Sequence, residues 1–215
     1  MNHIQRKINK VLGMRFSAVA IGLFFLLTAV HAFAGEARTV DASQLKVRLA
    51  VTYVKGESKP FSGKAVSSYE NDRQKSEESY LDGKRDGLAT FWYENGQKKR
   101  EENWQDGRQE GVTTLWHANG QKSSDLYFEN GQRHGKHTMW HENGQKSYEM
   151  NYKDGKFNGL FTEWYENGNK KLEVTYSSGQ KNGTESLWDK SGQLIKTMIW
   201  REGVLVEEGS SSEPK

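Results

Sequence analysis

Four histidines follow residue 34 and are the first candidates for metal chemistry: His117, His134, His137 and His141. His117 and His141 stand 24 residues apart, and Tyr93 and Tyr165 fill the equivalent places before and after them. With two strands per 24 residues, the pair lies about 10 Å apart. A divalent metal needs three or four converging ligands. An adventitious metal site is therefore the weaker interpretation, and we expect histidine to replace tyrosine as a surface aromatic, with no metal and no cofactor.

Carboxylates form a second regular set at intervals of 24 residues: Glu77, Glu101, Asp125, Glu149 and Glu173. Two carboxylates up to about 9.5 Å apart can hydrolyse glycosides, but the acid and the base need different environments. A repeat gives each carboxylate the same environment. We therefore interpret the set as a solvated face of cross-strand Glu–Lys pairs.

The sequence indicates no covalent nucleophile. The chain has no cysteine, and Ser123, Ser124 and Ser147 occupy repeat positions without the strand-turn-helix elbow that presents a catalytic serine. We therefore predict that the protein is not an enzyme, and the remaining question is what it binds.

Regularly spaced tryptophans are the candidate binding residues: Trp92, Trp116, Trp140, Trp164, Trp188, Trp104 and Trp200. Two interpretations stay open. The rings either stack on one another to hold a thin sheet together, or form an exposed stripe that stacks on sugar rings or on a partner.

A period of 24 residues governs the chain. Six glycines recur at this spacing without an insertion: Gly63, Gly87, Gly111, Gly135, Gly159 and Gly183. A second aromatic series has the same period: Tyr80, Trp104, Phe128, Tyr152, Tyr176 and Trp200. Between the aromatics lie alternating turn pairs, such as Asn95-Gly96 and Asp82-Gly83, which tolerate the positive φ of tight hairpin turns. Each copy is therefore predicted to be a β-hairpin.

The predicted fold is all-β, an elongated single-sheet array of antiparallel β-hairpins built from 24-residue repeats. The register at each Asn-Gly turn has two solutions. A two-residue loop pairs Trp92 with Lys99, whereas a three-residue loop with a bulge pairs it with Lys98. We favour the bulged form, on the expectation that it puts every large aromatic on one side of the sheet.

The chain divides into four predicted parts. Residues 1–34 resemble a signal peptide, with Arg6, Lys7, Lys10 and Arg15 before an apolar run and cleavage after Ala34, which predicts a periplasmic or extracellular protein. Residues 35–62 form a capping segment, in which alternation from Leu45 to Val54 predicts one strand over the open edge of the sheet. Residues 63–206 contain the six repeats, and residues 207–215 are predicted to be a disordered tail.

The repeat resembles the membrane occupation and recognition nexus (MORN) repeat, at stretches such as Tyr80 to Gly87 and Tyr152 to Gly159. It is most similar to the bacterial variant, in which the first strand runs into Trp-Tyr/His-x-Asn-Gly-Gln-Lys, as at Trp92 to Lys98. Chains of this kind are often labelled YwqK-family antitoxins. The resemblance implies a hairpin array that serves as an interaction surface, with no shared catalytic residues. It covers about residues 56 to 206.

Charge narrows the choice of partners. Removing the four Lys/Arg of residues 1–34 from the 31 in the chain leaves 27 against 28 Asp/Glu. This near balance argues against nucleic acid and against strong binding to lipid. Our leading hypothesis is a protein-interaction scaffold of the cell envelope or secreted space. The alternatives are binding to cell-wall or surface polysaccharide through the aromatic lattice, an antitoxin or immunity-like protein, and an enzyme assembled across several hairpins.

Overall fold

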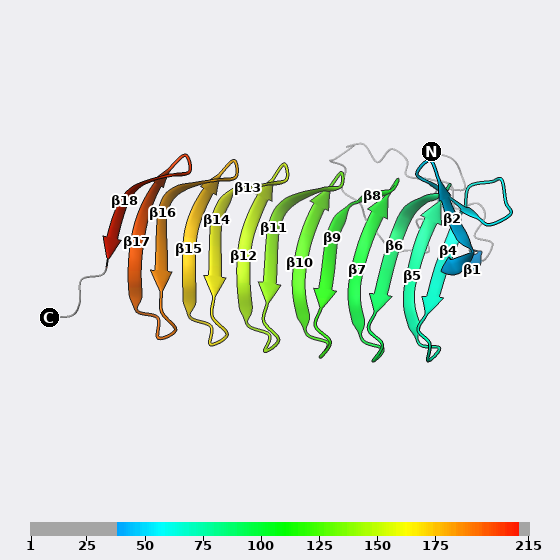
Figure 1. Cartoon of the computed structure of the whole chain (residues 1–215), viewed down its shortest axis with the longest axis horizontal. Coiled ribbons are helices and arrows are strands. Elements are labelled where there is room, and N and C mark those ends of the chain that lie inside the picture. The colour runs from blue at the N-terminus through cyan, green and yellow to red at the C-terminus, as the bar shows by residue number, and fades with distance from the viewer. Residues whose placement is uncertain (1–37, 211–215) are drawn as a thin grey trace, which may run out of the picture. The chain divides into compact units, whose positions relative to one another are not determined.

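The computed structural model describes residues 38–210, of which residue 210 is described only by its backbone. The predicted signal peptide lies outside the described residues. Fourteen strands lie side by side in one long sheet, in the order β1-β4-β5-β6-β7-β9-β10-β11-β12-β14-β15-β16-β17-β18 (Figure 1). The short strands β8 and β13 pair with β7 and β12, while β2 and β3 form a separate two-stranded sheet. The array of antiparallel hairpins predicted from the sequence is confirmed.

The element bounds are β1 Thr39–Asp41, the 3-10 helix η1 Ala42–Gln44, β2 Leu45–Arg48, β3 Val51–Val54, β4 Gly63–Ser68, β5 Gln74–Leu81, β6 Lys84–Trp92, β7 Lys98–Gln105, β8 Arg108–Gln109, β9 Gly111–Trp116, β10 Lys122–Glu129, β11 Gln132–Trp140, β12 Lys146–Lys153, β13 Lys156–Phe157, β14 Gly159–Trp164, β15 Lys170–Ser177, β16 Gln180–Trp188, β17 Leu194–Arg201 and β18 Val204–Ser210. The described part of the chain contains no helix that could span a lipid bilayer.

Each Asn-Gly turn carries a β-bulge. Trp92 lies opposite Lys98 whereas Phe91 lies opposite Arg100, so Lys99 is an extra residue on β7. The same shift occurs at every later Asn-Gly or Ser-Gly turn of this series. The bulged register favoured from the sequence is confirmed.

The bulge nevertheless separates the two aromatic series. Gly87 is the partner of Trp104, so the two share a face of the sheet. Trp92 stands five residues after Gly87 on the same strand, and alternation places it on the opposite face. The expectation that every large aromatic gathers on one side is therefore wrong. The physical reason is the extra residue at Lys99, which reverses the alternation of side chains along β7. Lys98, the partner of Trp92, and Trp104 therefore lie on opposite faces of the sheet.

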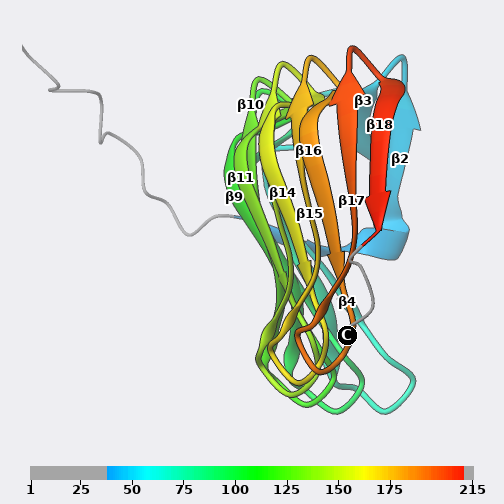
Figure 2. The same ribbon diagram turned by 90° about the vertical axis from the view of Figure 1, so that its left-hand side faces the viewer.

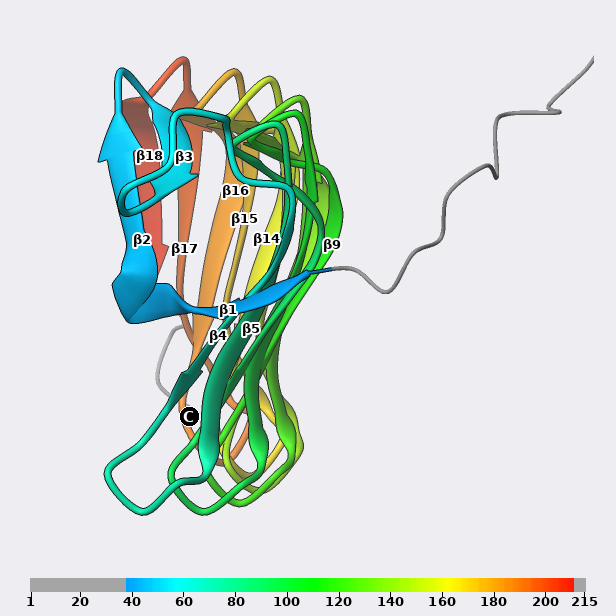
Figure 3. The ribbon, with the colours of Figure 1, turned by 90° about the vertical axis from the view of Figure 1, so that its right-hand side faces the viewer.

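The sheet bows along its strands, so that its two faces differ (Figures 2 and 3). The hollow side, which we call the concave face, carries Tyr80, Trp104, Phe128, Tyr152, Tyr176 and Trp200. The other side, which we call the convex face, carries Trp92, Trp116, Trp140, Trp164 and Trp188. The larger apolar cluster lies on the concave face, where buried Leu126, Met150 and Tyr152 pack with neighbouring aromatic rings.

The N-terminal cap differs from the predicted single strand. Leu49 and Ala50 adopt φ values of 49° and 62°, so the chain turns there and residues 45–54 form the β2–β3 hairpin. The edge of the sheet is instead covered by β1, which pairs in parallel with β4. Alternation could not reveal this turn because neither residue is a usual turn former.

The β2–β3 hairpin closes the concave face at its N-terminal end (Figure 3). Val54 and Phe61 are buried there with Val40 and Ala65. The amide of Gly83 donates a hydrogen bond to the carbonyl of Phe61 at 2.7 Å, which ties this segment to the β5–β6 turn. Gly83 has φ 78°, and a Cβ there would lie 2.8 Å from the carbonyl oxygen of Thr52, so this close approach requires glycine.

The C-terminal end also differs from expectation. Residues 207–210 continue β18, with Glu207 opposite Ile199 and Glu208 opposite Met198, rather than beginning a disordered tail. Backbone pairing with β17 orders these residues although their composition is typical of a tail. The remainder of the predicted tail, 211–215, lies outside the described residues.

Candidate binding surface

The structure divides the seven candidate tryptophans between two surfaces. Trp92, Trp116, Trp140, Trp164 and Trp188 lie on the convex face, and Trp104 and Trp200 lie on the concave face. All seven are half-buried. They therefore do not form one stripe, and each series has its own surroundings.

The convex tryptophans belong to a framework that links consecutive repeats. Lysines from the preceding repeat lie over their rings, with Lys98 Nζ 5.5 Å from the ring centre of Trp116 and Lys146 Nζ 5.7 Å from that of Trp164. These cation–π contacts cover the ring faces on which a sugar would have to stack. The Lys170–Trp188 pair repeats the arrangement at 5.7 Å.

The histidines at tyrosine positions perform the tyrosine role. The Tyr93 hydroxyl donates a hydrogen bond to the carbonyl of Trp116 at 2.8 Å. His117 Nε2 lies 2.9 Å from the carbonyl of Trp140, and His141 Nε2 makes the same contact with the next tryptophan carbonyl. Within residues 38–210, no group of three or more His, Cys, Asp or Glu side chains could hold a metal ion.

The repeated carboxylates lie on the convex face in ion pairs. Lys122 Nζ lies 2.8 Å from Asp125, three residues along the same strand, and Lys136 Nζ lies 2.9 Å from Glu149 on the neighbouring strand. Burial by itself would raise the pKa of Glu149, but hydrogen bonds from Lys146 and Lys136 outweigh it and lower that pKa. The Glu–Lys interpretation is confirmed, although most pairs lie within one strand instead of across two.

Two buried carboxylates lie on the concave floor, outside the 24-residue set that begins at Glu77. Glu102 is 4 % exposed and accepts hydrogen bonds from Trp104 Nε1 at 3.1 Å and Gln109 Nε2 at 2.9 Å. Glu185 is 3 % exposed and lies 2.7 Å from Lys181 Nζ and 2.6 Å from Trp200 Nε1. Each acid has its own cation and indole donor, so the pair holds rings in place instead of dividing acid and base roles.

One serine and one histidine meet on the same floor, a contact that spacing alone did not suggest. Ser124 Oγ lies 2.8 Å from His137 Nε2, and His137 Nδ1 is buried without a hydrogen-bond partner among the described residues. Burial, and then the charge of Arg133, lower the pKa of His137. Both side chains are buried and no carboxylate of residues 38–210 orients the imidazole, so the pair lacks the accessible nucleophile and third group of a catalytic triad.

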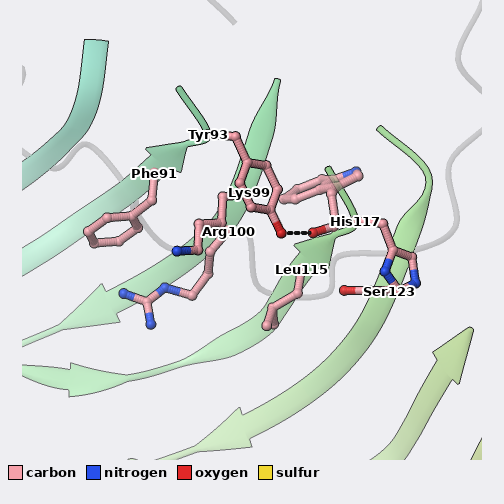
Figure 4. Close-up of a pocket in the computed structure, with 8 residues that line it drawn as sticks. Phe91, Tyr93, Lys99, Arg100, Leu115, His117 and Ser123 are labelled. Atoms are coloured by element: carbon pink, nitrogen blue, oxygen red, sulfur yellow. Dashed lines mark hydrogen bonds between the residues drawn. The ribbon is translucent and has the colours of Figure 1, made fainter. Parts of the chain in front are cut away.

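A pocket of about 280 Å³ opens between the second and third repeats (Figure 4). Phe91 and Leu115 contribute apolar surface, while Tyr93 and His117 line the side nearer the turns. Lys99 and Arg100, consecutive residues at the start of β7, supply two cationic groups that extend to the same side (Figure 4). Sequence reasoning missed this pocket. Its signal was the Lys99-Arg100 pair, where the next copy has Ser123-Ser124.

The two faces differ in how much the repeats vary. On the convex face one row reads Trp in five successive copies, and its neighbouring row reads Thr90, Thr114, Thr138, Thr162 and Ser186. On the concave face the corresponding rows are mixed: Ala89, Thr113, His137, Phe161 and Glu185, and then Phe91, Leu115, Met139, Glu163 and Leu187. The tryptophan and threonine rows of the convex face are therefore repeated framework, whereas both of these concave rows vary. A third convex row also varies: Leu88, Val112, Lys136, Leu160 and Thr184.

Comparison with known proteins identifies the repeat. Three segments match the MORN repeat variant, at residues 85–106, 133–154 and 157–178. A search of the curated proteins gave no match. MORN repeats are generally non-enzymatic, and the match suggests the binding role of a repeat protein. Three stretches within the hairpins from β6 to β15 thus match the MORN repeat variant.

Proposed function

We propose that this protein is a non-enzymatic scaffold of the cell envelope or secreted space, and that it holds another protein on its concave face. The observation that carries the proposal is the contrast between the two faces. The tryptophan and threonine rows of the convex face repeat from copy to copy, whereas the half-buried concave row changes while the backbone stays the same: Phe91, Leu115, Met139, Glu163 and Leu187. A sequence of different side chains along a fixed surface is what recognition of one particular partner requires.

The chemistry of the concave face favours a polypeptide. Its middle is apolar, with Met139, Tyr148, Phe161 and Leu172 half-buried around the cluster at Met150. A cationic pocket lies beside this middle, toward the N-terminal end. A partner would therefore need apolar side chains next to a negatively charged group. Such mixed surfaces are typical of protein interfaces, with an apolar centre and a polar rim.

The location outside the cytoplasm rests on residues 1–34, in which basic residues precede an apolar run and small residues surround the cleavage position at Ala34. Polysaccharide binding is the weaker candidate, because lysines lie over the rings of several convex tryptophans.

Site-specific photo-crosslinking tests the proposal. In the full chain, a benzophenone amino acid replaces either Met139 on the concave face or Leu160 on the convex face. Each variant is expressed in the cells that naturally produce the protein. Met139 is half-buried, whereas Leu160 is 47 % exposed, so simple accessibility favours the convex position. We expect one discrete protein adduct from Met139 and none from Leu160. Adducts from Leu160 alone, or adducts that contain glycan instead of protein, would contradict the proposal.

A further inference from the structure

The pocket between the second and third repeats contains more positive charge than the protein neutralises. Within residues 38–210, no carboxylate lies within ion-pair distance of Lys99, whose Nζ lies 5.5 Å from the ring centre of Tyr93. Arg100 contacts one acid, Glu102, through Nε at 3.3 Å, and its guanidinium carbon lies 4.3 Å from the ring centre of Phe91. Glu102 balances the charge of Arg100 while it accepts hydrogen bonds from Trp104 and Gln109, so Lys99 is the cation of the pocket that has no counter-charge among the described residues.

The equivalent lysine three repeats later, Lys171, shows which kind of group can neutralise a lysine at this bulge. Lys171 is the bulge residue there, as Lys99 is in the pocket, and Glu163 stands where the pocket has Phe91. Lys171 Nζ lies 2.6 Å from Glu163 Oε1. A lysine at this bulge can therefore reach a carboxylate placed over the neighbouring strand. At Lys99 the protein has an aromatic ring in that place and provides no such carboxylate from the described residues.

The remaining walls suit an apolar group attached to that carboxylate. Phe91, Leu115 and the ring of Tyr93 line the pocket (Figure 4). Its volume of about 280 Å³ is near the lower end of small-ligand pockets, which begin at about 300 Å³, so it suits one or two side chains. Charge-assisted hydrogen bonds to lysine and arginine are among the stronger polar contacts in proteins.

We infer that this pocket is a carboxylate-binding subsite that takes an acidic group with an adjacent apolar or aromatic group, as in an acidic peptide segment. The ligand carboxylate would occupy, relative to Lys99, the place that Glu163 occupies relative to Lys171. Arg100 adds a second donor, and Phe91 and Leu115 contact the apolar part. The inference deepens the proposed function, since it rests on a polypeptide lying along the concave face and names one anchor of that polypeptide.

Titration of the full chain with 3-phenylpropionate, followed by the methyl NMR signals of Leu115, tests the subsite. Its uncharged analogue 3-phenylpropanamide is the ligand control. For a probe of this size we expect a Kd on the order of 1 mM. The double variant Lys99→Gln/Arg100→Gln should weaken binding by about tenfold or more, and the amide should shift the signals far less than the acid.

Lys171→Gln is the matched protein control, because it removes one lysine from the same repeat position where Glu163 neutralises it. We expect it to change the Kd by less than about twofold. Three results would overturn the inference: equal weakening by Lys171→Gln and by the double variant Lys99→Gln/Arg100→Gln, equally tight binding of the amide, or no Leu115 shift at about 20 mM probe, well above the expected Kd. Each variant's methyl spectrum without ligand confirms that it is folded.

Two dipeptides separate the sources of the carboxylate. N-acetyl-Glu-Phe-amide offers a side-chain carboxylate, and N-acetyl-Ala-Phe with a free C-terminus offers a terminal one. The tighter ligand identifies the source, and binding of neither would contradict the peptide assignment. A partner still cross-linked from Met139 in a chain that binds no carboxylate would leave the proposed function standing and remove this subsite. Carboxylate binding without a cross-linked partner would leave this subsite standing and contradict the proposed function.

Discussion

The buried ion pair of Lys181 and Glu185 makes a sharp test of how the concave floor is held. Lys181 Nζ contacts both carboxylate oxygens of Glu185 at 2.7 Å, and Trp200 Nε1 donates to the same group at 2.6 Å. The Glu185 side chain is 4 % exposed, whereas that of Lys181 is 29 % exposed. Replacing Lys181 with methionine keeps most of the side-chain length and leaves a buried carboxylate without its cation.

The expected cost follows from these contacts. Removing one partner of a fully buried ion pair costs about 3–5 kcal/mol, because the other charge is left uncompensated. Water can reach Lys181 and can partly replace its ammonium group, so we expect a smaller loss of about 2 kcal/mol for Lys181→Met. The double variant Lys181→Met/Glu185→Leu removes both charges and should recover most of this loss, since no buried charge remains unpaired.

Hydrogen exchange is the suitable assay, because repeat arrays can open locally without unfolding as a whole. A loss of about 2 kcal/mol corresponds to roughly 30-fold faster exchange of the amides in β16 and β17. Lys122→Met is the control, since Lys122 pairs with Asp125 on the convex side of the sheet and its side chain is 52 % exposed. There we expect at most a few-fold change. The reasoning is refuted if the double variant exchanges as fast as Lys181→Met, or if Lys122→Met accelerates exchange equally.

Three further predictions concern a turn, a titration and the cap. Gly83→Ala should cost at least about 1 kcal/mol more in unfolding free energy than Gly155→Ala. Both glycines have positive φ, but only at Gly83 would a Cβ meet backbone, 2.8 Å from the carbonyl oxygen of Thr52. Equal urea midpoints of the two variants would contradict this prediction. Burial lowers the pKa of His137, so the unfolded state takes up the proton at a higher pH than the folded state. The unfolding free energy should therefore fall by up to about 1.4 kcal/mol per pH unit as the pH drops below the ordinary histidine pKa. Urea titrations of His137→Phe should no longer show this slope. Phe61→Ala should cost about 3–5 kcal/mol and expose the β2–β3 hairpin to protease, and an unchanged cleavage pattern would contradict the packing described for the cap.

The sequence predicted the hairpin array because its signals agree at several levels. Glycine spacing, Asp-Gly turns and aromatic alternation all require the same 24-residue unit, and the structure gives Asp82, Asp106 and Asp154 the positive φ that such turns need. The cap was harder to predict because its turn uses Leu49 and Ala50, which carry no turn signal. The end of β18, residues 207–210, was hard to predict for a different reason, because glutamate, glycine and serine are typical of a tail.

The candidate site was only partly predictable, since it depends on contacts between copies. Spacing identifies the tryptophans, but the face on which they lie depends on where the extra residue of each turn is inserted. Burial of Glu102 and Glu185 depends on indole and cationic partners that spacing does not bring together. The cationic pocket depends on the pair Lys99-Arg100, where the next copy has two serines, and the pair indicates no site until the neighbouring Phe91 and Leu115 are placed beside it.

The β-bulge explains how one chain can combine a fixed framework with a variable surface. Because it puts the Trp92 series on the convex face, the lysine–tryptophan contacts that join successive repeats are made on that side. The asparagines of the turns add links of their own, as when Asn143 Nδ2 donates to the carbonyl of Glu166 at 2.7 Å. The half-buried concave row changes from phenylalanine at Phe91 to leucine, methionine and glutamate in later copies while the backbone repeats, and this freedom is what a binding surface needs.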